Sequence, residues 1–302
     1  MKNPPTTPAT GKAHDLSVSI VLYKAPLDKL DACIASLDGC KLDWRLHLID
    51  NSPEPMAKAW LAKLNNRVSY EHGQGNVGFG AGHNIAIHRY CGEARYWLVL
   101  NPDAYFDDGL LEELVRRMDA DTRIGLCIPH IRNPDGSTQL VNKRLPTPSI
   151  FFLRPYIAKL TWLMKTPVIK DILQLWMLRF LLQDMDLDRP LICPFISGCF
   201  MFFRGSMMKE LNGFDERYFL YMEDLDISRR AAQRGLNVVF SDLTCFHHWE
   251  RAAYKSRKLF IVLVKSCVSY FNKWGWVLDM ERYAMNRRVR YYAGPKAGRD
   301  KV

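Results

Sequence analysis

The 302-residue sequence lacks several features that would define its class at once. Its eight cysteines contain no Cys-x-x-Cys pair, so they indicate neither a zinc finger nor a disulfide framework, and we expect reduced, cytosolic thiols. No uncharged apolar stretch reaches the roughly 18 residues that a membrane-spanning helix needs. Residues 1–15 are polar and rich in Pro and Thr, without the apolar core of a signal peptide. We therefore expect a disordered N-terminus over 1–15 and a protein that is neither secreted by that route nor membrane-spanning.

An excess of acidic residues is also absent, because the formal net charge is +10. Residues 251–302 carry 13 Lys and Arg against 3 Asp and Glu, whereas the first 250 residues carry equal numbers of each sign. A basic tail on a neutral body fits an anionic partner, either lipid or nucleic acid, or else a solvated tail with no partner. No finger, basic zipper or RNP-like strand motif supports nucleic acid. We therefore expect no nucleic-acid partner.

Apolar segments alternate with amphipathic ones through the first half of the chain. This alternation predicts a mostly parallel sheet that is flanked by helices, an α/β fold whose ligands bind beyond the carboxyl ends of the strands. Strands are expected at 18–23, 45–49, 68–71, 96–100 and 124–129, with helices at 27–37, up to 64, 82–91 and 110–118.

The second half is less regular. It predicts a helical insertion at about 145–185 and a basic, aromatic helical extension over 251–302, with one domain over 16–250. Within it we expect strands at 195–203, 238–240 and 244–247 and helices at 223–234 and 256–272.

Two polar clusters follow early strands. Asp50-Asn51-Ser52 comes after the second strand, where a carboxylate can accept a hydrogen bond from N3–H of uracil or thymine. For this cluster alone an Asx turn or a helix N-cap is the favoured alternative. The glycine-rich segment 75–84 precedes a helix, and amides at a helix start attract phosphate oxygens. It is neither a P-loop nor a dinucleotide fingerprint, and a plain tight turn stays open.

Two further clusters carry acids. Asn101-Pro102-Asp103 follows an apolar strand, and an acid there can ligate Mg²⁺ or Mn²⁺, with a capped turn as the alternative. Segment 214–226 places three acids within four positions behind the run YFLYM. An exposed acidic helix start is the alternative, but that run is too apolar for a purely exposed lead-in. His247 can add an imidazole to a metal site, although adjacent histidines are more often structural.

Seven segments in this order resemble family 2 glycosyltransferases of the GT-A fold, and most of all the rhamnosyltransferase-like branch of bacterial surface-polysaccharide biosynthesis. The resemblance runs from about residue 18 to about residue 276 and implies a GT-A domain over 16–250. The segments are SIVLY, LIDNS, GNVGFGAGHN, LNPDAYF, FISGCFMFFR, GFDERYFLYMEDLDISRR and HHWERAAYKSRK.

The resemblance implies roles for the matching residues. Asp224 is the expected general base, with Glu223 beside it in a catalytic acidic pair. Asp103 and His247 are the expected metal ligands, although Asn101 replaces the first acid of Asp-x-Asp and the adjacent histidine leaves the choice of imidazole open. The expected donor nucleotide-binding residues are Tyr23, Asp50, Asn51, Asn76, Gly78, Phe79, Gly82, Asn84 and Asn101. The acceptor-side candidates are Tyr221, Asp226 and Arg251.

The implied reaction is inverting transfer of a sugar, first L-rhamnose from dTDP-rhamnose, to a glycan on a polyprenyl diphosphate, with Mg²⁺ or Mn²⁺ as cofactor. UDP-galactofuranose, a UDP-hexose and non-catalytic nucleotide-sugar binding remain alternatives. The resemblance places this reaction in O-antigen or capsule synthesis at the inner face of the bacterial cytoplasmic membrane. Aromatics among lysines at 270–276, and the insertion, suit an anionic membrane surface, with a soluble helical subdomain as the alternative.

Overall fold

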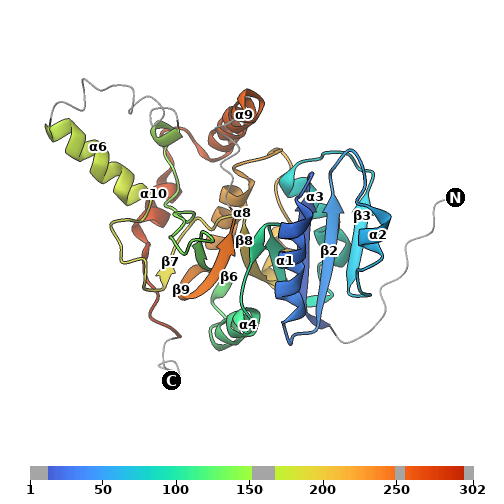
Figure 1. Ribbon diagram of the computed structural model, residues 1–302. Helices are drawn as coiled ribbons and strands as arrows, with labels where there is room; N and C mark the ends of the chain where they lie inside the picture. The colour runs from blue at the N-terminus through green and yellow to red at the C-terminus, as the bar shows by residue number, and fades with distance from the viewer. Residues whose placement is uncertain (1–12, 152–166, 249–255, 296–302) are drawn as a thin grey trace.

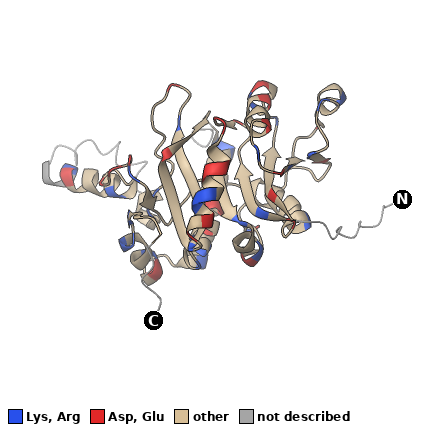
Figure 2. Ribbon diagram, turned by 90° about the horizontal axis from the view of Figure 1, so that it is seen from below, with Lys and Arg blue, Asp and Glu red and all other residues tan. Residues whose placement is uncertain are grey.

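The computed structural model describes residues 13–151, 167–248 and 256–295, which form a mixed α/β structure with a large sheet flanked by helices (Figure 1). The sheet of these residues has ten strands in the order β10-β7-β9-β6-β8-β4-β1-β2-β3, with β5 paired to β9 beside this path. The predicted α/β class is confirmed. Lys, Arg, Asp and Glu are interspersed over the body of the molecule, in agreement with its neutral charge (Figure 2).

The first half of the chain forms a parallel set of strands. β1 pairs in parallel with β2 on one side and β4 on the other, and β3 extends the set beyond β2. Most residues of β1, β2 and β4 are buried, whereas β3, at the end of the sheet, is only partly buried. Their bounds are β1 His14–Leu22, β2 Trp44–Asp50, β3 Val68–His72 and β4 Ala94–Leu100, and the helices are α1 Leu27–Asp38, α2 Lys58–Leu61, α3 Phe79–Tyr90 and α4 Leu110–Ala120.

The centre of the sheet is mixed rather than parallel. β8 (Phe200–Arg204) runs antiparallel to both β4 and β6 (Ile124–Arg132), so β6 again has the direction of β4. β9 (Leu236–His247) is one strand where two short ones were expected, and its register against β6 shifts between Pro129 and His130. That irregularity accounts for the break in the apolar pattern after residue 240.

The last part of the chain packs against α8 (Glu223–Ala232), which follows the short α7 (Gly205–Leu211). A second apolar core joins α8 to α9 (Arg257–Trp274) and α10 (Met280–Arg287). Tyr270 and Phe271 are fully buried in it, so the expectation that these two aromatics meet a membrane is wrong. The remaining elements are α6 Pro167–Phe180, β7 Leu191–Ile192 and β10 Arg290–Tyr291. Within the described ranges, every helix is too short or too polar to cross a membrane.

Candidate active site

The candidate site lies along one edge of the sheet. β2 and β4 run parallel with only β1 between them, so their carboxyl ends face the same way (Figure 1). Asp50 ends β2, and Asp103 follows β4 by three residues. Two strand spacings of about 4.8 Å each separate β2 from β4 by about 10 Å.

A two-residue strand brings His247 to Asp103. β5 (Ala104–Tyr105) pairs antiparallel with the end of β9, and Ala104 stands opposite His247. The Nε2 atom of His247 consequently lies 3.4 Å from Oδ1 of Asp103 and 3.2 Å from Nδ2 of Asn101. The structure therefore brings together both predicted metal ligands and the asparagine that precedes them.

Gln139 determines which nitrogen of this histidine faces the acid. Its Nε2 donates to the backbone oxygen of His247 at 2.6 Å, which turns its Oε1 toward Nδ1 of the ring at 3.0 Å. An amide oxygen only accepts, so Nδ1 carries the proton and Nε2 presents a lone pair. That lone pair and the carboxylate of Asp103 then face each other with no proton between them.

This arrangement fits a divalent cation. One ion can contact both Nε2 of His247 and Oδ1 of Asp103, because the two atoms are less than two metal–ligand bond lengths apart. No group of three or more His, Cys, Asp or Glu in the described part of the chain is arranged to hold a metal. The remaining ligands would have to be phosphate oxygens and water, the usual situation of Mg²⁺ in phosphate-transfer sites.

The predicted catalytic pair, Glu223 and Asp224, stands at the first turn of α8. Tyr221 and Met222 immediately before it have φ angles of 68° and 72°, a strained left-handed pair that ends the preceding loop abruptly. The carboxylate of Asp224 accepts hydrogen bonds from the backbone N–H groups of Gly198 at 3.1 Å and Leu225 at 2.8 Å. These bonds fix the orientation of the Asp224 side chain.

The two acids of the pair differ in access. Glu223 is buried and its Oε2 has no hydrogen-bond partner, whereas Asp224 is partly exposed. Burial raises the pKa of Asp224, and burial together with the negative charge of Asp224 raises the pKa of Glu223. Of the two, Asp224 is the carboxylate that a substrate can reach.

Segment 198–199 joins the acidic helix to the metal-ligand pair. The N–H of Asn101 donates to the oxygen of Cys199 at 3.0 Å, next to the glycine that binds Asp224. Burial, together with the carboxylates of Asp103 and Asp224, raises the pKa of the Cys199 thiol to about 12. Asp103 and Asp224 therefore both lie near this thiol and belong to one region.

The glycine-rich segment packs against the loop before α8. Gly78 has a φ of 95°, and a Cβ there would collide with the carbonyl oxygen of Phe219. The next residue, Phe79, donates its N–H to that same oxygen at 2.9 Å, and its ring lies beside Gly198. Asn76 accepts a bond from the N–H of Gly78 at 3.2 Å. This loop thus reaches the same region as Asp224.

Other predicted donor residues are turned inward. Asn84 binds both the N–H and the carbonyl of Phe214, at 2.7 and 2.9 Å, and Gly82 packs closely against Val21. Asn51 donates to the oxygen of Gly78 at 2.9 Å. Asn51 and Asn84 therefore direct their side-chain atoms at the protein backbone and hold these loops in place.

Asp50 forms an Asx turn, the alternative role that the sequence favoured for this cluster alone. Its Oδ1 accepts from the N–H of Ser52 at 2.9 Å, its Oδ2 accepts from the hydroxyl of Tyr70 at 2.6 Å, and the residue is fully buried. Tyr23, at the end of β1, is half exposed on the same edge. The structure thus shows Asp50 supporting the turn, and Tyr23 presenting a ring to solvent.

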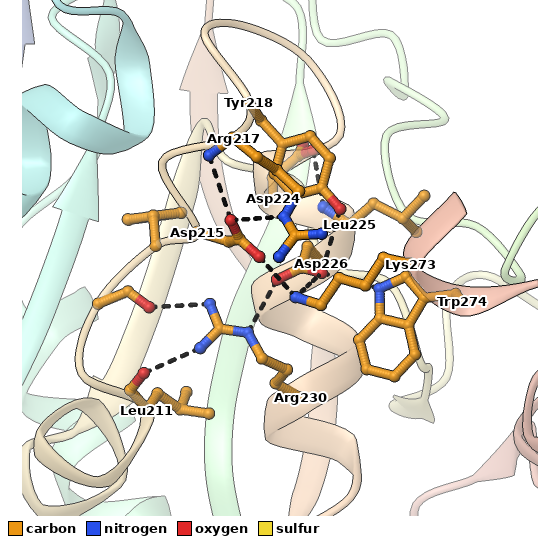
Figure 3. A network of polar contacts seen from close by, with 12 residues as sticks. Leu211, Asp215, Arg217, Tyr218, Asp224, Leu225, Asp226, Arg230, Lys273 and Trp274 are labelled. Atoms are coloured by element: carbon orange, nitrogen blue, oxygen red, sulfur yellow. Dashed lines mark hydrogen bonds and ion pairs between the residues drawn. The ribbon is translucent and has the colours of Figure 1, made fainter. Parts of the chain in front are cut away.

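The acceptor-side candidates have separate outcomes. Asp226 is fully buried and binds Arg230 at 2.8 Å and Lys273 at 2.6 Å (Figure 3). It is therefore part of a network inside the protein, and the expectation that it faces an acceptor does not hold. Tyr221 lies immediately before Met222 and the Glu223–Asp224 pair. Arg251 lies outside the described residues.

Sequence reasoning missed two residues of the site. Gln139, which orients His247, lies in an irregular segment after β6 and belongs to no motif. Gly198 lies within the motif FISGCF, but only the structure shows that a Cβ there would stand 3.2 Å from that of Asp224 and 3.4 Å from the Phe79 ring. A glycine at this position is the signal in the motif, because a larger residue would crowd Asp224 and Phe79.

The fold is that of GT-A glycosyltransferases. Solved structures with the same fold include GalNAc-T7 with UDP, GalNAc and Mn²⁺, with a TM-score of 0.57 and 16% identity over 78% of this chain and 43% of that one. The mannosyltransferase PcManGT from Pyrobaculum calidifontis with GDP-Man and Mn²⁺ has a TM-score of 0.56 and 13% identity over 90% and 68%. At such identities the likeness concerns the fold alone.

The chain belongs to glycosyl transferase family 2, whose family model matches residues 17–211. It is similar to an N-acetylglucosaminyl-diphospho-decaprenol L-rhamnosyltransferase of Mycobacterium tuberculosis, 28% identical over 187 residues that cover 57% of this chain and 56% of the relative. The rhamnosyltransferase WbbL of Escherichia coli K12 is 28% identical over 99 residues, 32% of this chain and 37% of that protein. The match thus spans about half the length of the first relative and less of the second.

Proposed function

We propose that this protein catalyses inverting transfer of a sugar, with L-rhamnose from dTDP-rhamnose as first choice, to a lipid-linked glycan. The observation that carries the proposal is the Asp103–His247 pair, which lies with the partly exposed carboxylate of Asp224 around segment 198–199. One side of this region suits a diphosphate and its cation, and the other suits a hydroxyl that must lose a proton. The names of the curated relatives support rhamnose and a polyprenyl-diphosphate acceptor.

The donor side has to stabilise the departing nucleoside diphosphate. A bound Mg²⁺ or Mn²⁺ would supply charge neutralisation there, held by Asp103 and the Nε2 lone pair of His247. Gln139 keeps that lone pair in place through the proton on Nδ1. Without a cation, Nδ2 of Asn101 donates to this same lone pair at 3.2 Å, so the amide would have to give way when a metal binds.

The acceptor side has to remove a proton while the bond to the sugar forms. Asp224 takes the hydroxyl proton on its carboxylate, a role that typically contributes about 10²–10⁴-fold to the rate. Burial, which raises its pKa, makes it a stronger base than an exposed aspartate. The bonds from Gly198 and Leu225 hold it in position.

A lipid-linked acceptor requires the protein to work at a membrane surface. The basic C-terminal extension suits peripheral association with the inner face of the bacterial cytoplasmic membrane, in O-antigen or related polysaccharide synthesis. UDP-galactofuranose and UDP-hexoses are the competing donors, because nothing in the described side chains distinguishes them from dTDP-rhamnose. The structure of a related fold with UDP shows that such folds bind this nucleotide.

A thermal-shift panel tests the proposal directly. The protein is heated with dTDP-rhamnose, UDP-galactofuranose or UDP-glucose, each with Mg²⁺, with Mn²⁺ or with a chelator. A ligand that binds only the folded state raises the midpoint of unfolding. We expect dTDP-rhamnose with metal to give the largest shift. Absence of any shift with every sugar nucleotide would contradict the proposal, and a larger shift with a UDP-sugar would replace rhamnose as the donor.

A further inference from the structure

The loop between α9 and α10 displays apolar side chains to solvent. Val277 is 83% exposed, Leu278 is 89% exposed and Met280 is 74% exposed. Three neighbouring apolar side chains with so little cover are unusual on a soluble surface and mark a site of interaction.

Hydrogen bonds hold this loop in a defined conformation, so the exposure of its side chains is a stable feature of the fold. Asp279, between Leu278 and Met280, is buried and binds Arg229 through two hydrogen bonds of 2.6 and 2.7 Å. The same carboxylate accepts from the N–H of Arg282 at 2.8 Å and caps α10. With the charged residue buried, its apolar neighbours are forced outward.

The exposed loop continues onto one face of α9. Trp276 folds back so that its Nε1 donates to the side chain of Asn272 at 2.8 Å, and its ring lies 5.3 Å from that of Phe271. Asn272, Val268 and Ile261 follow one another at spacings of four and seven residues on that helical face. Val268 and Ile261 are themselves exposed, so the apolar surface extends along the helix.

The charges around this surface are unbalanced. The two described acids of the extension, Asp279 and Glu281, are balanced by two arginines, since Arg229 pairs with both and Arg282 lies 3.8 Å from Asp279. Arg257, Lys258 and Lys265 on α9 are exposed. A second copy of the chain would bring like charges together, whereas an anionic surface would complement them.

We propose that residues 276–280, together with the exposed face of α9, form the docking surface for an anionic lipid bilayer. Val277, Leu278 and Met280 enter the interface between headgroups and acyl chains, and the cations of α9 contact the headgroups. The proposal rests on the proposed function for its purpose, since it names the surface on which a lipid-linked acceptor is met. Arg229 lies on α8, so the docking loop is anchored to the helix that begins with the catalytic pair.

Vesicle co-sedimentation of the full chain tests this surface, without donor or acceptor present. The variant is Val277→Ser/Leu278→Ser, and Leu27→Ser is the matched control because that leucine is exposed on α1, outside the docking surface. Vesicles of phosphatidylglycerol and phosphatidylcholine are compared with phosphatidylcholine alone. We expect wild type and control to sediment with the anionic vesicles. The partition coefficient of the double variant should be lower by about tenfold or more.

Three outcomes would overturn the proposal: the double variant sediments like wild type, wild type fails to sediment, or the double substitution abolishes self-association in light scattering instead. Nucleotide-induced thermal shifts of the same variants report folding and the donor site separately. Failure of the proposed function would appear as absent sugar-nucleotide shifts in wild type, whatever the vesicles show. Substitution is preferred to truncation, because removal of the extension would take Lys273 from the buried Asp226 and Asp279 from the buried Arg229.

Discussion

Lys273 is expected to secure the C-terminal extension to the active-site helix. Its ammonium binds the buried carboxylate of Asp226 at 2.6 Å and that of Asp215 at 2.7 Å (Figure 3). Lys273→Met keeps the aliphatic stem and removes the charge. Asp226 then retains Arg230 at 2.8 Å and the indole N–H of Trp274 at 2.8 Å, but loses its shortest bond.

The cost follows from burial. Breaking a buried ion pair by removing one partner costs about 3–5 kcal/mol. Because Asp226 keeps three other donors, the third being the hydroxyl of Tyr218 at 3.4 Å, we expect the lower end, about 3 kcal/mol. With about 2 °C per kcal/mol for a chain of this size, the midpoint of thermal unfolding should fall by about 6 °C.

Arg217→Met is the matched control. Arg217 binds the same Asp215 at 2.8 Å, but its side chain is 48% exposed, and exposed pairs contribute about 0–1 kcal/mol. Differential scanning calorimetry of wild type and both variants at neutral pH measures the contrast. Equal midpoints for the two variants, or a Lys273→Met midpoint within a degree or so of wild type, would refute the reasoning that buried charge pairing secures α9.

The difference should also depend on pH. Burial raises the pKa of Asp215, but hydrogen bonds from Lys273 and Arg217 outweigh it and hold this pKa at about 2, below the ordinary 3.8. The lowered pKa of Asp215 stabilises the folded state above pH 3.8, and this stabilisation is lost as the pH falls through about 2. Part of the stability gap between wild type and Lys273→Met should therefore disappear in acid.

Glu223→Gln should gain stability relative to wild type as the pH rises above 4.5. The pKa of Glu223 is raised from 4.5 to about 8 in the folded protein, so wild type loses folding stability between these two values and the glutamine variant does not. Denaturant titrations at pH 5 and about 8 check the sign, and a relative loss of stability at the higher pH would contradict it. Gly78→Ala should unfold more easily than Gly75→Ala, since both have positive φ but only Gly78 meets the Phe219 carbonyl; equal melting points would contradict this. Asp103→Ala should weaken Mn²⁺-dependent nucleotide binding about tenfold or more, and an unchanged metal effect in calorimetry would exclude it as a ligand.

Much of the fold could be predicted because long apolar strands have a strong local signal. The strand expected at 45–49 is Trp44–Asp50, and the helix expected at 27–37 is Leu27–Asp38. The two-residue strands β5, β7 and β10 have no readable period, and their pairing partners are distant in sequence. The antiparallel direction of β8 likewise depends on its neighbours, not on its own residues.

The site could be predicted in composition but not in detail. The sequence presents Asp224 and Asp226 as equivalent acids, yet successive helical residues turn by about 100°, so two residues apart they face opposite sides. Asp224 accordingly faces Gly198, in the turn before β8, while Asp226 faces α9. The two hydrogen bonds of Asp50 likewise depend on Tyr70, from the neighbouring strand, as well as on the local turn.

Asp224→Asn tests the central claim most directly. Asn has nearly the same shape and can still accept the bond from the N–H of Gly198, but it cannot take a proton. Sugar-nucleotide affinity and the rate of sugar transfer are measured on the same preparation, with the donor that the thermal-shift panel selects. The account predicts unchanged affinity and a transfer rate lowered by about 10²–10⁴-fold. Transfer at close to the wild-type rate would contradict it.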